Sequence, residues 1–410
     1  MLGTQAFCRQ NQDAGETPAF PVNTNLRLQM FDRHCIFATR IGGMEQEPLK
    51  RTALHTSHIE SGGRMVPFGG WEMPVQFRGI IEEHNAVRTK SGVFDISHMG
   101  EFFVSADSPE KVDACLNRLL TNDVSRLKVG QGQYSFLLNE QGGVVDDLIL
   151  YRQSPNTFFV VVNASKIDED FARLTALSDA GVEWSNRSGE FSAVALQGPE
   201  SVDIYRKAFG KDAPMPSRFE LSLLAWREQT ILVARTGYTG EDGVELFFPH
   251  SLARPVWSLL LEKGAMPIGL GARDTLRMEA CYPLNGNDLD ATTTPLEAGM
   301  SFAVAINKPD FVGKNALTVQ IAAGLSRKLV AFSIEGKGAP PRSHYQLFLG
   351  TQKVGEVTSG TFSPSLQKGI GLGYVSAHAS APGTVLDMEV RGQRVPIVIK
   401  PKPLYKGHSL

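Results

Sequence analysis

Long apolar runs are absent from this sequence of 410 residues, and none approaches the roughly 20 residues that a helix needs to cross a bilayer. The apolar stretch Phe158–Val162 is short and predicts a buried strand instead. An excess of one charge is also lacking, since 41 basic residues nearly balance 43 acidic ones and the formal net charge is −2. Neither a membrane-spanning protein nor a basic nucleic-acid-binding surface is therefore expected.

Metal-ligating patterns are missing as well. The four cysteines form no CxxC pair, and the nine histidines form no HExxH sequence, so we expect neither a bound metal nor a disulfide framework. Reduced thiols are typical of a cytosol-like compartment. We expect a cytoplasmic protein if the source is bacterial, which we favour, and a protein of the mitochondrial matrix if it is eukaryotic.

Nucleotide-binding and hydrolase signatures are not present. The glycine-rich segment Gly369–Gly373 reads GIGLG and lacks the GxGxxG spacing of a dinucleotide site. No GxxxxGK[ST] phosphate loop and no GxSxG nucleophile elbow occur. An NTPase, a dinucleotide-dependent enzyme and an α/β-hydrolase are thus not supported.

The first 43 residues are polar and lack both a secretory apolar core and an Arg-rich amphipathic helix. We interpret them as an extension, a poor transit peptide or the product of a mis-chosen start codon, and we favour the last, with Met44 as the true start. Residues 1–47 are accordingly expected to form a disordered or non-native N-terminal extension.

Strand and helix patterns alternate irregularly over the next 280 residues. Helices are expected where apolar residues recur at helical spacing, and strands where short apolar or β-branched runs lie between turn residues. The predicted helices are 80–91, 109–120, 168–177, 201–208, 252–263 and 272–280. The predicted strands are 101–104, 134–138, 147–151, 157–163, 191–196, 230–234 and 244–248. Because strict βαβ alternation is missing, the class is α+β rather than a doubly wound sheet.

The composition changes after Gly324, and short strands separated by Gly, Pro and Ser follow. These are predicted at 329–334, 346–349, 353–358, 370–375 and 385–390. Such spacing is typical of a small β-barrel or sandwich. We therefore predict one region at 48–325, built of two intertwined α+β lobes, and a C-terminal β-barrel at 326–410.

Two acidic, glycine-flanked segments are the strongest chemical signals. In Gly142–Leu148 (GGVVDDL), Asp146 and Asp147 would point to opposite faces of a strand, so one of them is expected to reach a given pocket. An arbitrary pair of this kind more often consists of solvated turn residues, but an apolar run around the pair favours a polar cleft.

The second segment, Arg235–Glu245, ends in GYTGEDGVE, and Glu245 alone would be an exposed strand carboxylate. Arg273 and Arg277 lie four residues apart on one helix face. They form either a surface ion-pair lattice or a fork-shaped donor for a carboxylate or a carbonyl-rich heterocycle.

Taken in order, these segments resemble the aminomethyltransferase (T-protein) family of the glycine cleavage system, over about residues 48–405. The matching segments are LKRTAL at 49–54, MVPFGGW at 65–71, FDISHM at 94–99, GGVVDDL at 142–148, LQGP at 196–199, GYTGEDGVE at 237–245, GARDTLRMEA at 271–280, TPLE at 294–297 and TSG at 358–360. The resemblance implies a three-lobed α+β fold with a central folate cleft and a C-terminal β-barrel.

The implied reaction transfers the methylene carbon of aminomethyl-lipoyl H-protein to tetrahydrofolate as co-substrate. The products are 5,10-methylenetetrahydrofolate, ammonia and the dihydrolipoyl arm. The chain has no lipoyl-lysine motif, so lipoylated H-protein and the other glycine cleavage components are the expected partners, and nucleic acid and membrane are not.

The resemblance also implies site residues. Asp147 matches the acidic position beside the reacting folate nitrogens, and Glu245 matches the position that bonds the pterin edge. Further folate-contacting positions are Arg273, Tyr405, Met99, Tyr134, Tyr151, Val161 and Asn163.

Two alternatives share this fold. One is a tetrahydrofolate-dependent demethylase acting on a sulfonium substrate. The other is a non-enzymatic folate-binding protein of iron–sulfur assembly, whose hallmark loop contains a cysteine. The comparable segment here, Ile306–Lys314, contains none.

Overall fold

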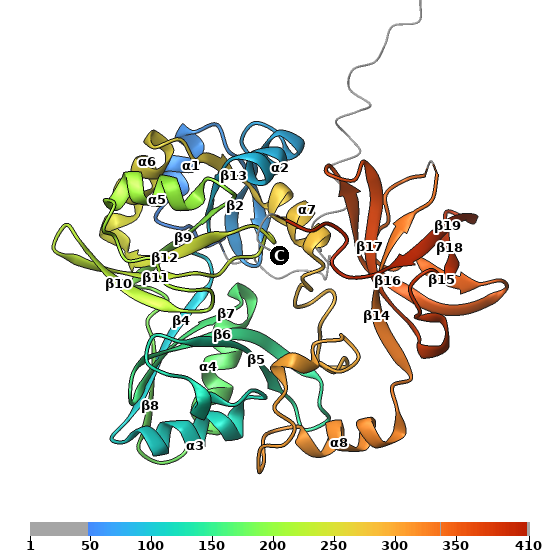
Figure 1. Ribbon diagram of the computed structural model, residues 1–410, viewed down its shortest axis with the longest axis horizontal. Coiled ribbons are helices and arrows are strands. Elements are labelled where there is room, and N and C mark those ends of the chain that lie inside the picture. Colours follow the sequence, from blue (N-terminus) through green and yellow to red (C-terminus); the bar gives the residue numbers. More distant parts are fainter. Residues whose placement is uncertain (1–47, 337, 408–410) are drawn as a thin grey trace, which may run out of the picture. The chain divides into compact units, whose positions relative to one another are not determined.

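The computed structural model describes residues 48–336 and 338–407 (Figure 1). The predictions for the N-terminal extension lie outside the described residues. In the described part of the chain, no helix is long and apolar enough to cross a membrane.

Five strands form the first sheet, in the order β5-β6-β7-β4-β8. Their bounds are β4 Gly100–Ala106, β5 Gly132–Leu138, β6 Val144–Ser154, β7 Thr157–Val162 and β8 Val182–Asn186. Helices α3 (Pro109–Leu119) and α4 (Ile167–Ala176) cover one face through a buried apolar cluster. Helix α3 begins as expected, because Ser108 Oγ accepts a hydrogen bond from the Lys111 N–H at 3.4 Å.

The second sheet has six strands in the order β10-β11-β12-β9-β3-β13. Their bounds are β3 Gly92–Asp95, β9 Phe191–Gln197, β10 Leu221–Trp226, β11 Gln229–Ala234, β12 Gly243–Pro249 and β13 Met266–Ile268. Its outer face packs on α5 (Ser201–Phe209) and α6 (Ala253–Glu262), around Trp257. Leu54, which lies just before α1 (His55–Glu60), joins the same cluster.

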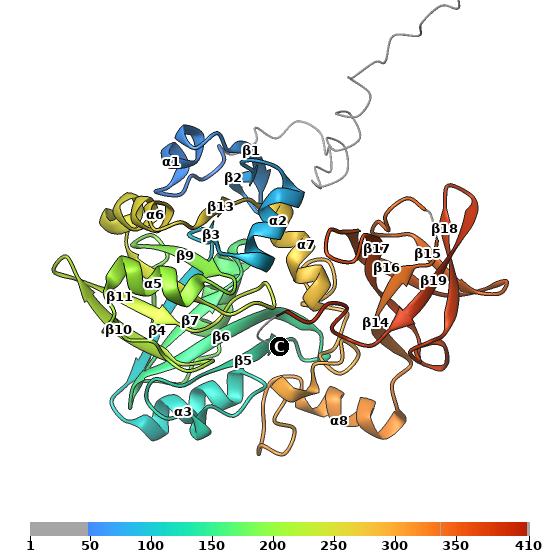
Figure 2. The same cartoon turned by 45° about the horizontal axis from the view of Figure 1, so that its top comes forward.

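The inner faces of the two sheets meet in a shared apolar core. Tyr151 and Phe159 come from the first sheet, and Ala193, Leu232 and Phe247 from the second. Figure 2 shows the sheet of β5 to β7 running beneath that of β9 to β12. Helices α2 (Ile80–Thr89) and α7 (Leu270–Ala280) and the β1–β2 hairpin (Arg64–Phe68 and Trp71–Gln76) complete this part of the fold.

A closed barrel follows, with the strand order β14-β17-β16-β15-β18-β19. The bounds are β14 Arg327–Ile334, β15 Gln346–Leu349, β16 Gln352–Ser363, β17 Lys368–Ser376, β18 Val385–Val390 and β19 Gln393–Lys400. Its interior is filled by buried side chains that include Phe332, Leu347, Val357, Met388 and Ile397. The expected α+β class with a C-terminal barrel is thus confirmed. Strand β19, which the sequence did not suggest, closes the barrel by pairing with β14 and β18.

Helix α7 is fastened to the barrel by two buried polar networks. In the first, Arg277 donates to Asp288 at 2.7 Å and to the Ser359 hydroxyl of β16 at 3.1 Å. The lattice of surface ion pairs considered for Arg277 is therefore wrong, because this residue is only 3% exposed.

The second network centres on Glu279. Its carboxylate accepts hydrogen bonds from Arg88 at 2.8 Å, from the Ser363 hydroxyl, and from the N–H and hydroxyl of Ser365 at 3.1 and 2.9 Å. Burial would raise the pKa of Glu279, but the nearby His84, followed by Arg88 and Ser363, outweighs that effect and lowers the pKa to about 2.

The segment of residues 308–323, between the sheets and the barrel, has an ordered structure. Its second half is helix α8 (Lys314–Ala323). Lys308, at the start of the segment, is buried and donates to the carbonyls of Asn117, Leu120 and Asn122 at 2.6 to 2.9 Å. It thereby satisfies acceptors at the end of α3 that the helix itself leaves unpaired.

Candidate active site

Asp147 is presented by strand β6 after a close-packed glycine turn. At Gly143, an added Cβ would lie 1.9 Å from the carbonyl oxygen of Ala291, so only glycine fits there. Successive side chains of the strand then point to alternate faces of the sheet. Asp146 faces the same side as Leu148 and Leu150, towards α4, and Asp147 faces the opposite side. Both aspartates lie in a strand, directly after an irregularity of its pairing at Val145, so the solvated-turn interpretation is wrong, whereas the expected opposition of their faces is confirmed.

Three side chains converge on the Asp147 carboxyl. The Tyr134 hydroxyl of β5 donates to Oδ2 at 2.7 Å, and the Asn163 amide at the end of β7 donates to Oδ1 at 3.1 Å. The Asn285 side chain also faces this carboxyl. Its amide nitrogen is buried and makes no hydrogen bond within the usual geometry among the described residues.

The electrostatics of Asp147 are unusual for a carboxyl group. Burial, reinforced by the nearby Asp146, raises the pKa of Asp147 from its ordinary 3.8 to about 7, against the hydrogen bonds from Tyr134 and Asn163 and the nearby Asn285 amide, which all lower it. A carboxyl with a pKa near neutrality exchanges its proton readily under physiological conditions. Asp147 therefore has the properties of a general acid or base.

Glu245 is the acceptor at the end of a second hydrogen-bonded chain. The Thr236 hydroxyl donates to Glu245 Oε2 at 2.5 Å, so the Tyr151 hydroxyl, 2.9 Å from Thr236 Oγ1, donates to Thr236 in turn. Burial raises the pKa of Glu245, while Thr236 and Arg273 oppose that rise. A carboxylate has about four acceptor positions, so Glu245 retains capacity for further N–H donors.

The glycine turn between β11 and β12 is held by Gln197 of β9. A Cβ at Gly237 would lie 1.9 Å from Gln197 Oε1, and the Gln197 amide donates to the Thr236 carbonyl at 3.0 Å. This packing fixes Tyr238, whose hydroxyl donates to the Pro283 carbonyl. The Arg273 guanidinium of α7 lies over the Tyr238 ring, 5.0 Å from its centroid.

Arg273 lies close to the Glu245 carboxyl and to the Tyr238 ring. It is half-buried and interacts with both Glu245 and Tyr238, and Tyr238 in turn senses Asp147. Burial lowers the pKa of Arg273, although it stays cationic. The structure thus gathers Asp147, Glu245 and Arg273 from three elements around one region.

Tyr405 lies on another side of α7. Its backbone N–H donates to the Glu279 carbonyl at 3.0 Å, and its ring lies 4.6 Å from the Arg88 guanidinium. Arg88 also donates to Glu241 and to the Thr239 carbonyl at 2.9 and 2.8 Å. Tyr405 is therefore linked to the glycine turn through Arg88.

The remaining predicted residues lie in the first sheet or directly beside its strands. Met99 and Val161 are half-buried and pack against the core shared by the two sheets. Tyr151 belongs to that core and is 0% exposed, so its hydroxyl reaches Glu245 only through Thr236. Tyr134 and Asn163 contact Asp147 directly, as described above.

Sequence reasoning missed two polar residues of this site, Thr236 and Asn285. Thr236 lies within the second glycine segment, and its place just before the glycines was a usable signal. Asn285 had no local signal, because its approach to Asp147 joins residues more than 130 positions apart in the sequence.

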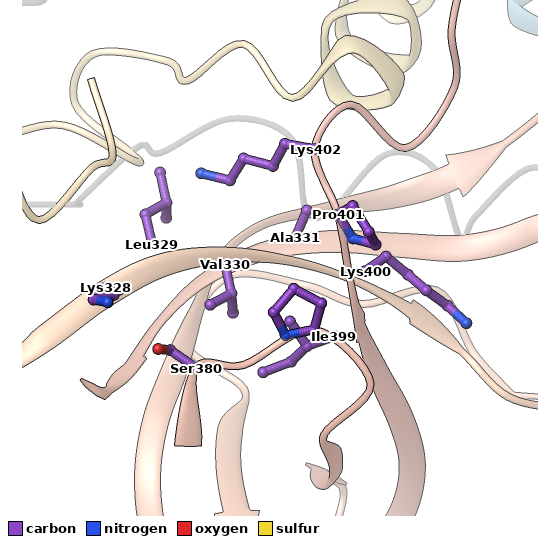
Figure 3. Close-up of a pocket in the computed structure, with 10 residues that line it drawn as sticks. Lys328, Leu329, Val330, Ala331, Ser380, Ile399, Lys400, Pro401 and Lys402 are labelled. Carbon is purple, nitrogen blue, oxygen red and sulfur yellow. The ribbon is translucent and has the colours of Figure 1, made fainter. Parts of the chain in front are cut away.

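A separate cavity of about 170 Å³ lies on the barrel (Figure 3). It is lined by Leu329, Val330, Ala331 and Ile399, with Lys328, Lys400 and Lys402 around it. Figure 3 shows the three ammonium groups directed apart rather than towards one point. The cavity is therefore not built as an anion site, and it contains none of the predicted residues.

Within residues 48–336 and 338–407, no group of acidic, histidine and cysteine side chains is arranged to hold a metal ion.

A mixed α+β body with a six-stranded barrel carries a half-buried carboxyl whose raised pKa is typical of an active-site group that handles protons. Comparison with known proteins makes this specific. Residues 54–308 match the model of the GCVT N-terminal domain, and residues 327–406 match that of the glycine cleavage T-protein C-terminal barrel domain. The chain belongs to the glycine cleavage T-protein family, and its activity is that of an aminomethyltransferase of the glycine cleavage system.

Individual relatives agree. An aminomethyltransferase of Desulfitobacterium hafniense is 46% identical over 363 residues, which cover 87% of this chain and 98% of the relative. One of Bacillus mycoides is 44% identical over 371 residues, which cover 87% of this chain and 98% of that protein. The crystal structure of the glycine cleavage system aminomethyltransferase T from Bartonella henselae superposes with a TM-score of 0.82 at 33% identity, covering 88% of this chain and 99% of that one.

Proposed function

We propose that the chain transfers the methylene carbon of an aminomethyl group, carried on the lipoyl arm of H-protein, to tetrahydrofolate. The products are 5,10-methylenetetrahydrofolate, ammonia and dihydrolipoyl H-protein. One observation carries the proposal: Asp147 is sheltered, has a pKa of about 7, and is oriented by both Tyr134 and Asn163. Such a group can accept a proton from a nitrogen nucleophile at neutral pH.

The side chains present fit a folate ring. A pterin presents a row of N–H donors along one edge, and Glu245 has acceptor capacity left after its single bond from Thr236. The Asn285 amide nitrogen, which faces Asp147 without a hydrogen bond, offers a donor to a ring carbonyl or nitrogen. Bound tetrahydrofolate would supply the nitrogen nucleophile that receives the carbon.

Each residue then has a defined task. Asp147 orients the reacting nitrogens, accepts a proton and stabilises positive charge on the carbon being transferred. Glu245 binds the pterin edge, and Arg273, fixed over Tyr238, faces the ligand as a cation. Tyr405, Met99, Tyr134, Tyr151, Val161 and Asn163 are proposed to complete the folate site, with Tyr151 acting through Thr236.

The carbon donor is proposed to be lipoylated H-protein, with the arm entering opposite Asp147. Membership of the glycine cleavage family supports this partner, because the reaction needs a carrier for the aminomethyl group. The relatives cited above are bacterial, which supports our proposal of a cytoplasmic protein.

The decisive experiment compares two donors in the presence of tetrahydrofolate. Purified protein is incubated with aminomethyl-lipoyl H-protein or with a sulfonium methyl donor, and ammonia and methylenetetrahydrofolate are measured. We expect both products with H-protein and no turnover with the sulfonium. Turnover with the sulfonium alone would favour the demethylase, and folate binding without turnover of either donor would favour a non-enzymatic folate-binding protein.

A further inference from the structure

Behind Asp147, on the other side of β6, lies a second pair of acids that the proposed reaction does not use. Asp146 and Asp170 are both 0% exposed, and Asp170 comes from helix α4. Among the described residues, neither oxygen of Asp170 receives a hydrogen bond from an N–H or hydroxyl donor. The carboxyl of Asp146 is its close polar neighbour, and the two groups act on each other's pKa.

A hydrogen bond between two carboxyl groups needs a proton on one of them, because two carboxylates have no hydrogen to share. Their burial makes the doubly ionised state more costly still. Two buried carboxyl groups in contact are therefore expected to hold one proton and one negative charge between them at neutral pH.

Asp146 is also connected to Asp147 through a single amide. Its Oδ1 accepts from the Asn163 side chain at 2.8 Å, and its Oδ2 accepts from the Asn163 backbone N–H at 3.1 Å. The same side-chain nitrogen of Asn163 lies 3.1 Å from Asp147 Oδ1 and 3.0 Å from the Asp147 carbonyl. Asp146 thus holds Asn163 at two points while Asn163 donates to Asp147.

We propose that Asp146 and Asp170 share one proton and act as a positioning pair, which fixes Asn163 and keeps one negative charge behind Asp147. The fixed amide orients the Asp147 carboxyl. The charge makes Asp147 harder to ionise, so that it works as a base near neutral pH rather than as a permanently ionised group.

The other charged and titratable groups near the pair do not replace it. Glu169 of α4 raises the pKa of Asp170, and Lys166 of the short 3₁₀ helix before α4 lowers it. From β5, Tyr134 faces the aspartates and is neutral at physiological pH, since burial and Asp147 raise its pKa. Burial, aided by Asp170, raises the pKa of Asp146 well above its ordinary value, and burial raises the pKa of Asp170 to about 6, in keeping with a shared proton.

The test measures the pKa of Asp147 directly, by carbon-13 NMR of folate-free protein labelled at aspartate carboxyls. The Asp147 signal is assigned by its loss in Asp147→Asn. Asp146→Asn removes the nearer charge and is expected to lower the Asp147 pKa by about 0.5 to 1. Asn163→Ser removes a donor that stabilises the ionised form and is expected to raise the same pKa by a similar amount.

Replacing Asp170 by Asn distinguishes a proton shared by the two carboxyl groups from simple packing of their side chains. In Asp170→Asn an amide N–H takes the place of the shared proton and the charge stays on Asp146, so the Asp147 pKa should change by less than about 0.3. Asp168→Asn, on the exposed side of the same helix, is the matched control and should change nothing. An unchanged Asp147 pKa in Asp146→Asn, or changes of equal sign in Asp146→Asn and Asn163→Ser, would overturn the proposal.

The role in turnover rests on the proposed function. We expect Asp146→Asn to lower kcat by about tenfold and to move the acid limb of its pH profile to lower pH. The NMR titration needs no substrate, so it tests the acid pair even if wild-type protein fails to turn over. If Asp146→Asn does not fold, Asn163→Ser gives the opposite-signed change on its own, and its absence contradicts the proposal.

Discussion

The Tyr134 hydroxyl donates a hydrogen bond of 2.7 Å to Asp147 Oδ2, across the neighbouring strands β5 and β6. This bond stabilises the ionised carboxylate and so opposes the rise in pKa that burial causes. Tyr134 therefore adjusts the pH range over which Asp147 can accept a proton.

Replacing Tyr134 by Phe is expected to raise the Asp147 pKa further, by about 0.5 to 1. Because turnover needs ionised Asp147, the acid limb of the kcat profile should move to higher pH. The measurement is kcat between about pH 5.5 and 9, on both sides of the expected pKa, with saturating substrates. A profile that superposes on that of the wild type would show that the bond has no influence on the catalytic ionisation.

Asp147→Asn should abolish turnover but preserve folate binding. The amide keeps the shape of the side chain and loses its ability to accept a proton, which typically costs about 10²- to 10⁴-fold. Steady-state turnover and a tetrahydrofolate titration check the two halves of this prediction. Asp146→Asn should have a smaller effect, since its side chain faces α4, and near-normal turnover in Asp147→Asn would remove Asp147 from the mechanism.

Asp147 is also expected to reduce stability as the pH rises. Its folded-state pKa of about 7 lies above the ordinary 3.8 of an exposed aspartate, so its contribution to stability is greatest below about pH 4 and is lost as the pH rises through 7. Because a difference of one in pKa corresponds to about 1.4 kcal/mol, the free energy of unfolding falls by up to about 4 kcal/mol over this range.

Asp147→Asn cannot ionise, so its melting temperature should exceed that of the wild type by several degrees at about pH 8, with a smaller gain at about pH 5. Melting curves of both proteins at the two pH values test this. A gain that is equal at the two pH values would contradict the raised pKa of Asp147.

Glu245→Gln should weaken tetrahydrofolate binding without unfolding the protein. The amide exchanges one acceptor for a donor, which would face ring N–H groups and the Thr236 hydroxyl. Affinity is measured by titration, with Glu228→Gln, in the exposed turn between β10 and β11, as the control. Equal affinity of wild type and Glu245→Gln would place Glu245 outside the folate site.

Residues 1–43 are expected to be dispensable, since they contain no periodic apolar pattern and no motif. A protein that starts at Met44 should match the full chain in melting temperature and in turnover. A loss of many degrees would instead show that the extension packs on the rest of the protein.

The sequence predicted the parts of the fold whose signals are local. Helix α3 was predicted within one residue, because Ser108 caps it, Pro109 occupies its first turn and its apolar stripe faces the core. Strands β8 and β10 lack a clear alternation of buried and exposed residues, and β13 has only three residues. For these reasons, no sequence pattern predicted the three strands.

The residues of the candidate site also divide into those with a local sequence signal and those without one. Asp147, Glu245 and Arg273 lie in glycine-rich or charged segments that stand out in the sequence, and the structure gathers them around one region. Asn285 and Asp170 come close to the aspartates of β6 through the packing of segments that are distant in the sequence. No local pattern of residue types could have selected them.

The fastening of α7 to β16 has a consequence for protein engineering. Arg277 donates a hydrogen bond to Ser359, and Glu279 accepts hydrogen bonds from Ser363 and Ser365, all three on the barrel side. Arg273 of the same helix belongs to the candidate site. A barrel transplanted from a relative would have to bring hydroxyl groups to the same three positions. Without them Arg277 and Glu279 would keep Asp288 and Arg88 as partners but lose buried hydrogen bonds beneath the helix that carries Arg273, so exchange of the barrel would disturb a site to which the barrel strands contribute no predicted residue.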